Sequence, residues 1–279
     1  MLLSPGIDVK QEDVVEKDVA FVLDTSGSMA GKKIEQAKKA LEFCLHNLNE
    51  GDRFEVVRFS TEAEPVFGKL VRASGKARKK AVNFVDSVRA IGGTAIEEAL
   101  LLASSTVSEK ALKGRPAQVI FMTDGQPTIG AIDEDVILKS LSKKLEDVKT
   151  RARIFCFGIG TNINTHLLDK ITEKTNATSQ YVLPEEDIEY KVSRFYSKIS
   201  EPVLAELKIG IKGPERVHKI YPKELSDLFK GDQMVVMGRY RPGKKAGDIT
   251  LSGTIRGKKE TFTYKGSFPK ENKDNGFIP

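Results

Sequence analysis

The stretch "DVAFVLDTSGSM", residues 18–29, places an apolar run directly before a cluster of small, oxygen-bearing side chains. The run "VAFVL" is continuous rather than alternating, which is typical of a strand buried on both faces of a parallel sheet. A carboxylate at Asp24 and hydroxyls at Ser26 and Ser28 follow at once. The stretch therefore predicts a central strand that delivers polar side chains to one edge of a sheet.

The bulk composition is that of an ordinary globular chain of 279 residues with a net charge of +6. No window approaches the ~18 consecutive apolar residues of a membrane span, and the first residues, "MLLSPGIDVK", lack the pattern of a signal peptide. Cys44 and Cys156 lie in a predicted helix and a predicted strand, where thiols usually serve as small apolar side chains rather than as a disulfide framework. Lysines and arginines are spread along the chain, so we expect no nucleic-acid partner. The densest basic run, residues 69–80, is interpreted as a solvated loop and helix face rather than a polyanion site.

Residues 17–200 alternate short apolar runs with amphipathic helical stretches, the pattern of a doubly wound, mainly parallel α/β sheet with helices on both faces. Strands are predicted at residues 18–24, 53–60, 118–124 and 153–160, with shorter ones at 64–68 and 179–183. Helices are predicted at 34–48, 77–88, 96–107, 136–148, 165–174 and 188–199.

The pattern changes after Glu201-Pro202, where short runs rich in Val, Ile, Thr and Tyr are separated by Gly, Pro and Asp turns. These runs predict a small antiparallel, sandwich-like β domain over residues 201–270. Residues 2–10 are a candidate for an extra strand of this domain. Residues 271–279 are interpreted as the tail of a fragment excised from a longer protein.

Three segments bring oxygen ligands to the carboxyl edge of the predicted sheet, where ligands of such sheets bind. They are "DTSGS" at residues 24–28, "GGT" at 92–94 and "TDG" at 123–125. Each one alone has a structural explanation as a helix cap or a turn. Together, hydroxyls and carboxylates without His or Cys form a set of hard oxygen donors, the chemistry of Mg²⁺, Mn²⁺ or Ca²⁺.

In this order and at these places, the three motifs resemble the metal-ion-dependent adhesion site of von Willebrand factor A domains. The resemblance covers residues 18–200. It implies that Ser26, Ser28 and Thr94 contact a cation, Mg²⁺ foremost, through their hydroxyls. It also implies that Asp24 and Asp124 bind that cation directly or hold its waters.

The run "IYPKELSDLFKGDQMVVMGRY", residues 220–240, resembles the segment that follows the A domain in inter-alpha-trypsin inhibitor heavy chains and related bacterial surface or secreted proteins. This resemblance implies a location that is secreted, at the cell surface or periplasmic. It does not carry over the covalent hyaluronan link of the animal heavy chains, which depends on a region outside this chain.

Neutral hydroxyls with only two carboxylates leave a divalent ion incompletely neutralised and with a coordination position to fill. An Asp or Glu of a protein partner could fill that position. We therefore expect a divalent-metal-dependent binding or adhesion module rather than an enzyme.

Two alternatives stay open at this point. The domain could be a structural spacer or assembly unit whose metal only stabilises loops. A Mg²⁺-dependent phosphatase is disfavoured, because Ser26 stands where haloacid-dehalogenase-type enzymes need a second aspartate. Hydrolysis by a serine needs a histidine within reach, and His46, His166 and His218 are not evident partners.

Overall fold

The chain is described by a computed structural model. The described residues are 2–3, 16–108, 115–147, 152–199, 202–223, 225, 228–229, 234–255 and 258–269. They divide into two compact units, Val15–Ser200 and a second one that combines Met1–Val14 with Glu201–Pro279. We call them the α/β unit and the β unit.

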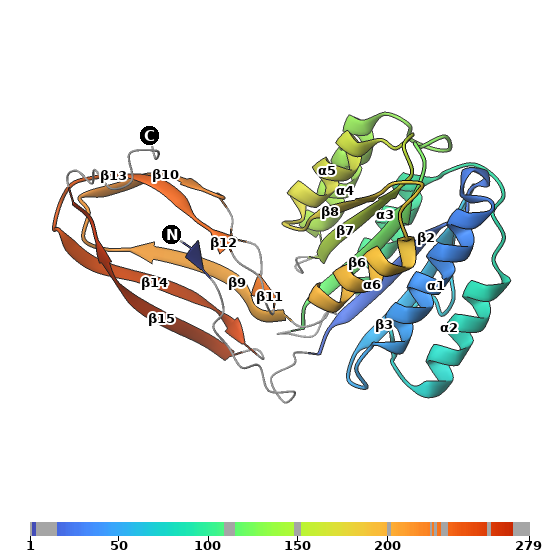
Figure 1. Ribbon diagram of the computed structural model, residues 1–279, viewed down its shortest axis with the longest axis horizontal. Coiled ribbons are helices and arrows are strands. Elements are labelled where there is room, and N and C mark those ends of the chain that lie inside the picture. The colour runs from blue at the N-terminus through green and yellow to red at the C-terminus, as the bar shows by residue number, and fades with distance from the viewer. Residues whose placement is uncertain are drawn as a thin grey trace. The chain divides into compact units, whose positions relative to one another are not determined.

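The sheet of the α/β unit has the strand order β4-β3-β2-β6-β7-β8, with β5 also paired to β3 (Figure 1). Its strands are β2 (Asp18–Asp24), β3 (Arg53–Phe59), β4 (Ala63–Pro65), β5 (Val71–Arg72), β6 (Ala117–Thr123), β7 (Ala152–Ile159) and β8 (Ser179–Val182). The five strands from β3 through β8 in this order run parallel, whereas β4 and β5 run antiparallel to β3. The predicted mainly parallel α/β sheet is confirmed.

Six α-helices cover the two faces of this sheet in the described part of the unit (Figure 1). They are α1 (Lys32–His46), α2 (Gly75–Ser87), α3 (Ile96–Ser108), α4 (Glu134–Asp147), α5 (Thr165–Lys174) and α6 (Ile188–Ile199). A short 3-10 helix, η2 (Gly27–Met29), lies between β2 and α1. Helix α1 contacts both α2 and α6, and α4 contacts both α3 and α5, so each set of three forms one layer.

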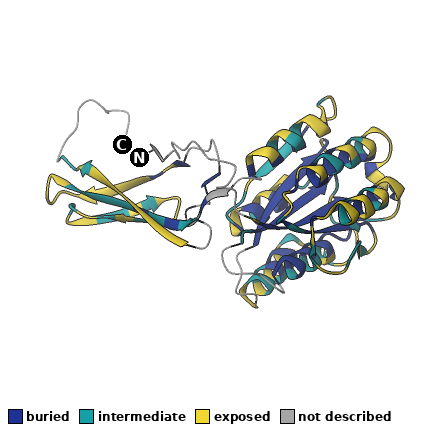
Figure 2. Ribbon diagram, turned by 90° about the horizontal axis from the view of Figure 1, so that it is seen from below, coloured by how far each residue is buried: buried dark blue, intermediate teal, exposed yellow. Residues whose placement is uncertain are grey.

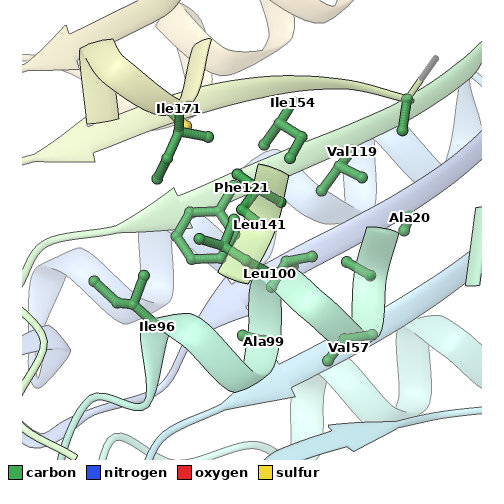
Figure 3. Packing of buried hydrophobic residues seen from close by; sticks show 14 of the residues in the cluster. Ala20, Val57, Ile96, Ala99, Leu100, Val119, Phe121, Leu141, Ile154 and Ile171 are labelled. Carbon is green, nitrogen blue, oxygen red and sulfur yellow. The ribbon is translucent and has the colours of Figure 1, made fainter. Parts of the chain in front are cut away.

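The core of the α/β unit is apolar on both faces of β2, as its continuous apolar run predicts. Ala20 and Val22 pack with Leu100 of α3 and Leu141 of α4 on one face (Figure 3). Phe21 points to the other face, where its ring lies 5.8 Å from that of Tyr196 in α6. All seven residues of β2 are buried, Asp24 at its end included, and the strands of this sheet are dark blue in Figure 2.

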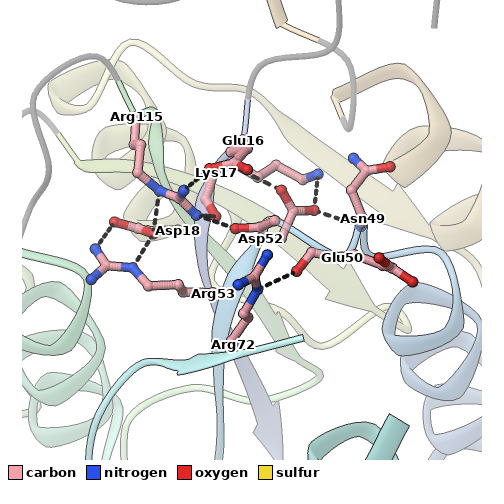
Figure 4. Close-up of polar contacts among 10 residues, drawn as sticks. Glu16, Lys17, Asp18, Asn49, Glu50, Asp52, Arg53, Arg72 and Arg115 are labelled. Atoms are coloured by element: carbon pink, nitrogen blue, oxygen red, sulfur yellow. Dashed lines mark hydrogen bonds and ion pairs between the residues drawn. The ribbon is translucent and has the colours of Figure 1, made fainter. Parts of the chain in front are cut away.

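The amino edge of the sheet holds a network of ion pairs (Figure 4). The buried Lys17 ammonium lies 2.6 Å from Asp52 Oδ2, and both side chains are fully enclosed. Asp18 accepts hydrogen bonds from Arg53 Nε at 2.8 Å and from Arg115 Nε at 3.1 Å. Each of these two buried carboxylates therefore faces a cation of the chain itself.

The β unit is antiparallel throughout its described strands. These are β1 (Leu2–Leu3), β9 (Pro202–Ile211), β10 (Arg216–Tyr221), β11 (Leu228–Phe229), β12 (Met234–Val235), β13 (Met237–Arg241), β14 (Ala246–Ile255) and β15 (Lys258–Ser267). One sheet has the order β11-β9-β14-β15, and the pairs β10-β13 and β1-β12 stand beside it. An apolar cavity of about 150 Å³ is lined by residues of both β9-β14 and β10-β13, as in a small sandwich.

Several boundaries differ from the sequence prediction. The short strand predicted at residues 64–68 is β4, which ends at Pro65, and β5 was not predicted; both pair antiparallel with β3. Helices α1, α2 and α4 begin two residues before their first predicted apolar residue, because polar residues fill the first turn. Leu2–Leu3 pair with Met234–Val235, whereas residues 4–10 of the predicted extra strand and the tail at 271–279 lie outside the described residues.

Candidate metal site

The five predicted ligands lie at the carboxyl edge of the α/β sheet, on three loops. Asp24 ends β2, and Ser26 and Ser28 follow in the turn around η2. Thr94 precedes α3, and Asp124 follows β6 directly. The neighbouring parallel pairing of β2 and β6 brings the first and third loops to the same place.

A chain of hydrogen bonds connects four of the five residues. Asp24 Oδ1 accepts from the Ser26 amide at 2.7 Å, and the hydroxyls of Ser26 and Ser28 lie 3.0 Å apart. The Ser28 hydroxyl donates to Asp124 Oδ1 at 2.8 Å. Asp24, Ser26 and Asp124 are buried, whereas Ser28 is exposed, so the group forms one wall that reaches the surface.

Thr94 lies close to Gly125, the residue that follows Asp124. A Cβ atom on Gly125 would lie 3.5 Å from Thr94 Oγ1 and 3.7 Å from Ser28 Oγ. The hydroxyls of Thr94 and Ser28 therefore both lie close to Gly125. Thr94 itself is held by Thr128, whose hydroxyl accepts from the Thr94 amide at 2.8 Å and whose amide donates to the Thr94 carbonyl at 3.0 Å.

The serines do not cap helices, which was the structural alternative for them. Helix α1 has Gly31 at its N-cap position, and no side-chain cap bond is formed there. Ser26 is the N-cap residue of η2 but makes no side-chain cap bond to it. The hydroxyls of Ser26 and Ser28 are turned to each other and to Asp124 instead. Met29, which follows Ser28 directly, is fully buried.

Burial dominates the electrostatics of Asp24. It raises the pKa of this carboxyl to about 6, against the lowering effect of hydrogen bonds from Ser26 and Thr123, and the nearby Asp124 raises it further. The Thr123 hydroxyl donates to Asp24 Oδ2 at 2.5 Å. These donors are neutral, so a bound cation would stabilise the ionised form of Asp24.

Lys33, which none of the three sequence motifs contains, also contacts this group of side chains. Its ammonium donates to the Ser28 carbonyl at 3.0 Å and forms an ion pair with Asp124 Oδ2. Lys33 comes five residues after Ser28, in the first turn of α1. The spacing of Lys33 from Ser28 does not by itself assign Lys33 to the site, because the position of its side chain depends on how the chain folds between η2 and α1.

A cavity of about 540 Å³ opens beside these residues. Ser28, Lys33, Thr94 and Asp124 form part of its lining. The remaining lining residues come from loops after β6, β7 and β8: Gly125, Gln126, Thr128, Gly160, Thr161, Asn162 and Pro184. The candidate site is therefore open to a group from outside the chain.

The donor set consists of two carboxylates and three hydroxyls, all of them oxygen ligands. Within the described residues, no group of three or more His, Cys, Asp and Glu side chains is placed to hold a metal. A site here would depend on hydroxyls to complete it, which fits a hard cation such as Mg²⁺ rather than a soft one. His46 pairs with Glu42, and His166 lies 2.5 Å from Glu134, so neither is a partner of the serines.

A comparison with protein families matches the von Willebrand factor type A domain to residues 17–181. The chain belongs to this family. The match spans β2 through most of β8 and includes all three loops of the candidate site. Among the described residues, no helix is long and apolar enough to cross a membrane.

Curated relatives include inter-alpha-trypsin inhibitor heavy chains. The human heavy chain H4 is 32% identical over 250 residues, which cover 88% of this chain and 26% of the relative. The human heavy chain H1 is 28% identical over 237 residues, covering 83% of this chain and 26% of the relative. The chain thus spans about a quarter of the length of these relatives, and the matches extend beyond the vWA domain.

Solved structures with the same fold include a von Willebrand factor type A protein from Catenulispora acidiphila. It superposes with a TM-score of 0.68 at 21% identity, covering 90% of this chain and 66% of that one. The pilus adhesin SpaC from Lactobacillus rhamnosus GG gives a TM-score of 0.55 at 14% identity, covering 92% of this chain and 45% of that one. At these identities the likeness shows the fold alone.

Proposed function

We propose that the vWA domain is a divalent-metal-dependent protein-binding module in which an acidic residue of a partner completes the coordination of a Mg²⁺ ion. The observation that carries the proposal is the convergence of two carboxylates and three hydroxyls beside an open cavity. Membership of the vWA family and the similarity to heavy chains support an interaction module of this kind. Mn²⁺ or Ca²⁺ could take the place of Mg²⁺ on the same oxygen donors.

The five residues have two kinds of role in this proposal. Ser26, Ser28 and Thr94 would bind the ion through neutral hydroxyls. Asp24 and Asp124 would bind it or its waters and supply its negative charge. Because only two carboxylates balance the ion, it retains positive charge for an incoming Asp or Glu.

The proposal includes a binding rather than a catalytic role, and a location that is secreted, at the cell surface or periplasmic. Relatives named as inter-alpha-trypsin inhibitor heavy chains support this class of protein. The described contacts of His46 and His166 give neither Ser26 nor Ser28 a general base.

The test is a binding assay on the immobilised chain, with extracellular material of the source organism as the analyte, in Mg²⁺ and in EDTA. We expect a protein retained in Mg²⁺ to be released by EDTA and not to bind Asp24→Ala. Asp86→Ala is the matched control, because Asp86 is an exposed aspartate on α2. Binding that survives both EDTA and Asp24→Ala would contradict the proposal.

The same variants separate the two alternatives. A structural spacer would retain its partners in Asp24→Ala, since the metal would only stabilise loops. A Mg²⁺-dependent phosphatase would turn over a generic phosphate ester and lose that turnover in Asp24→Ala. Either result would overturn the proposed role.

A further inference from the structure

Lys33 places a positive charge directly on a proposed metal ligand. Its ammonium pairs with Asp124 Oδ2, while Ser28 occupies the other carboxylate oxygen of Asp124 through its hydroxyl. The Asp124 side chain is fully enclosed, and the Lys33 side chain is 37% exposed. Both oxygens of this carboxylate are therefore engaged by donors of the chain itself.

A divalent ion that uses Asp124 has to compete with this ammonium. The two positive charges repel each other, and both need the same carboxylate. Lysine carries its charge on a flexible four-carbon stem, and partial exposure lets that stem swing away. The expected cost to metal binding is that of a partly exposed ion pair, at most about 1 kcal/mol, or about fivefold in affinity.

The cavity offers a second place for the ammonium. A Cβ atom on Gly160 would lie 3.7 Å from Lys33 Nζ, so the ammonium already borders the loop after β7. Among the described residues that line the cavity, Lys33 is the one with a positive charge. The lining of this cavity also includes the neutral side chains of Thr161 and Asn162. An acidic group that enters the cavity would meet this ammonium.

We propose that Lys33 couples metal binding to ligand binding. Alone, it weakens the metal site by competing for Asp124. When an acidic ligand is present, the displaced ammonium pairs with the ligand's carboxylate, so that metal and ligand stabilise each other's binding. This inference rests on the proposed metal-dependent function and adds Lys33 as a residue that selects acidic partners.

The first test measures Mn²⁺ alone, by calorimetric titration of EDTA-stripped protein. Lys33→Gln should bind Mn²⁺ more tightly than the unchanged chain, by up to about fivefold, because the competing charge is gone. Lys32→Gln removes the same charge from an exposed neighbour and should bind with unchanged affinity. Lys33→Arg keeps the charge and should bind no more tightly than the unchanged chain.

The second test repeats the Mn²⁺ titration in saturating glutarate, a dicarboxylate probe for the acidic ligand. Glutarate should tighten Mn²⁺ binding in the unchanged chain and in Lys32→Gln by a larger factor than in Lys33→Gln. Equal Mn²⁺ affinity in the unchanged chain and Lys33→Gln, or an equal effect of glutarate on both, would overturn the inference while leaving the proposed metal site intact. Failure of every protein to bind Mn²⁺ would instead refute the proposed function, and this inference with it.

Discussion

At the amino edge of the α/β sheet Asp18 and Asp52 each face a cation of the chain, whereas at the carboxyl edge Asp24 receives hydrogen bonds from neutral donors. All three carboxylates are buried. Buried charges are tolerated when they are paired or bind metals. At the amino edge, ion pairs within the chain therefore balance the charges of the buried carboxylates. The carboxyl edge has the chemistry of a site at which a cation from solution would balance the charge.

The position of Lys33 sharpens this contrast. It pairs with Asp124, so one carboxylate of the candidate site does have a cation of the chain. Unlike the fully enclosed Lys17, Lys33 is partly exposed and borders a cavity. The enclosed ammonium of Lys17 stabilises the fold, whereas the partly exposed ammonium of Lys33 is able to exchange one partner for another.

The largest effect is expected from Asp52→Ala at the amino edge. It leaves the Lys17 ammonium buried without its carboxylate, which should lower the free energy of unfolding by about 3–5 kcal/mol. Urea unfolding followed by circular dichroism measures this change. At a temperature where the variant is folded, its Mn²⁺ affinity should stay the same. A loss of both stability and Mn²⁺ affinity would show that the two edges are not independent.

Saturating metal should stabilise the chain through the carboxyl edge. At a Mg²⁺ concentration one hundred times the dissociation constant, the free energy of unfolding should rise by about 2.7 kcal/mol by mass action. Thermal unfolding with Mg²⁺ and with EDTA measures the shift. Asp24→Asn should show no shift in thermal unfolding with Mg²⁺. An equal shift in this variant would mean that the stabilising metal binds at a site other than the carboxyl edge.

Thr123→Val tests the support of Asp24 without removing a proposed ligand. The variant keeps the shape of the side chain but loses the hydroxyl that donates to Asp24 Oδ2 at 2.5 Å. Loss of a hydrogen bond to a ligating carboxylate should weaken Mn²⁺ binding about tenfold. Ser105→Ala, a change on α3 that removes a hydroxyl bonded to the Leu101 carbonyl, is the control and should leave the affinity unchanged.

The smallest effect is expected from pH. Metal binding needs the ionised carboxylate, and the pKa of Asp24 is about 6, so a proton competes with the cation as the pH falls through that value. Lowering the pH from about 7.5 to about 5.5 should weaken Mn²⁺ binding about fourfold. In EDTA the sign for stability is opposite, because the raised pKa means that protonation favours the folded state over this range. An affinity that does not change with pH would contradict the assignment of Asp24.

Much of this picture could be predicted from the sequence. The continuous apolar run of β2 predicted a buried parallel strand, and parallel strands deliver their last residues to a common edge. That reasoning placed Asp24, Ser26, Ser28, Thr94 and Asp124 together, although they are up to 100 residues apart in the sequence. The described contacts confirm that these loops meet, while the binding of a metal stays a prediction.

Other features depend on three-dimensional contacts that a linear pattern does not contain. Lys33 contacts Asp124 although 91 residues separate them in the sequence. The ion pairs of Lys17 and Asp18 connect the starts of neighbouring strands, and the sequence alone does not show which strands are neighbours. In the β unit short antiparallel strands were predictable, but β11 (Leu228–Phe229) was not, and the strand order, with β9 between β11 and β14, comes from long-range pairing.

The central claim is that the carboxyl edge binds a divalent cation through Asp24. The most direct test is calorimetric titration of the EDTA-stripped chain with Mg²⁺, beside Asp24→Asn and the exposed control Asp86→Asn. We predict saturable binding of one ion to the unchanged chain and to Asp86→Asn, and none to Asp24→Asn. Absence of binding to the unchanged chain, or equal binding to Asp24→Asn, would contradict the account.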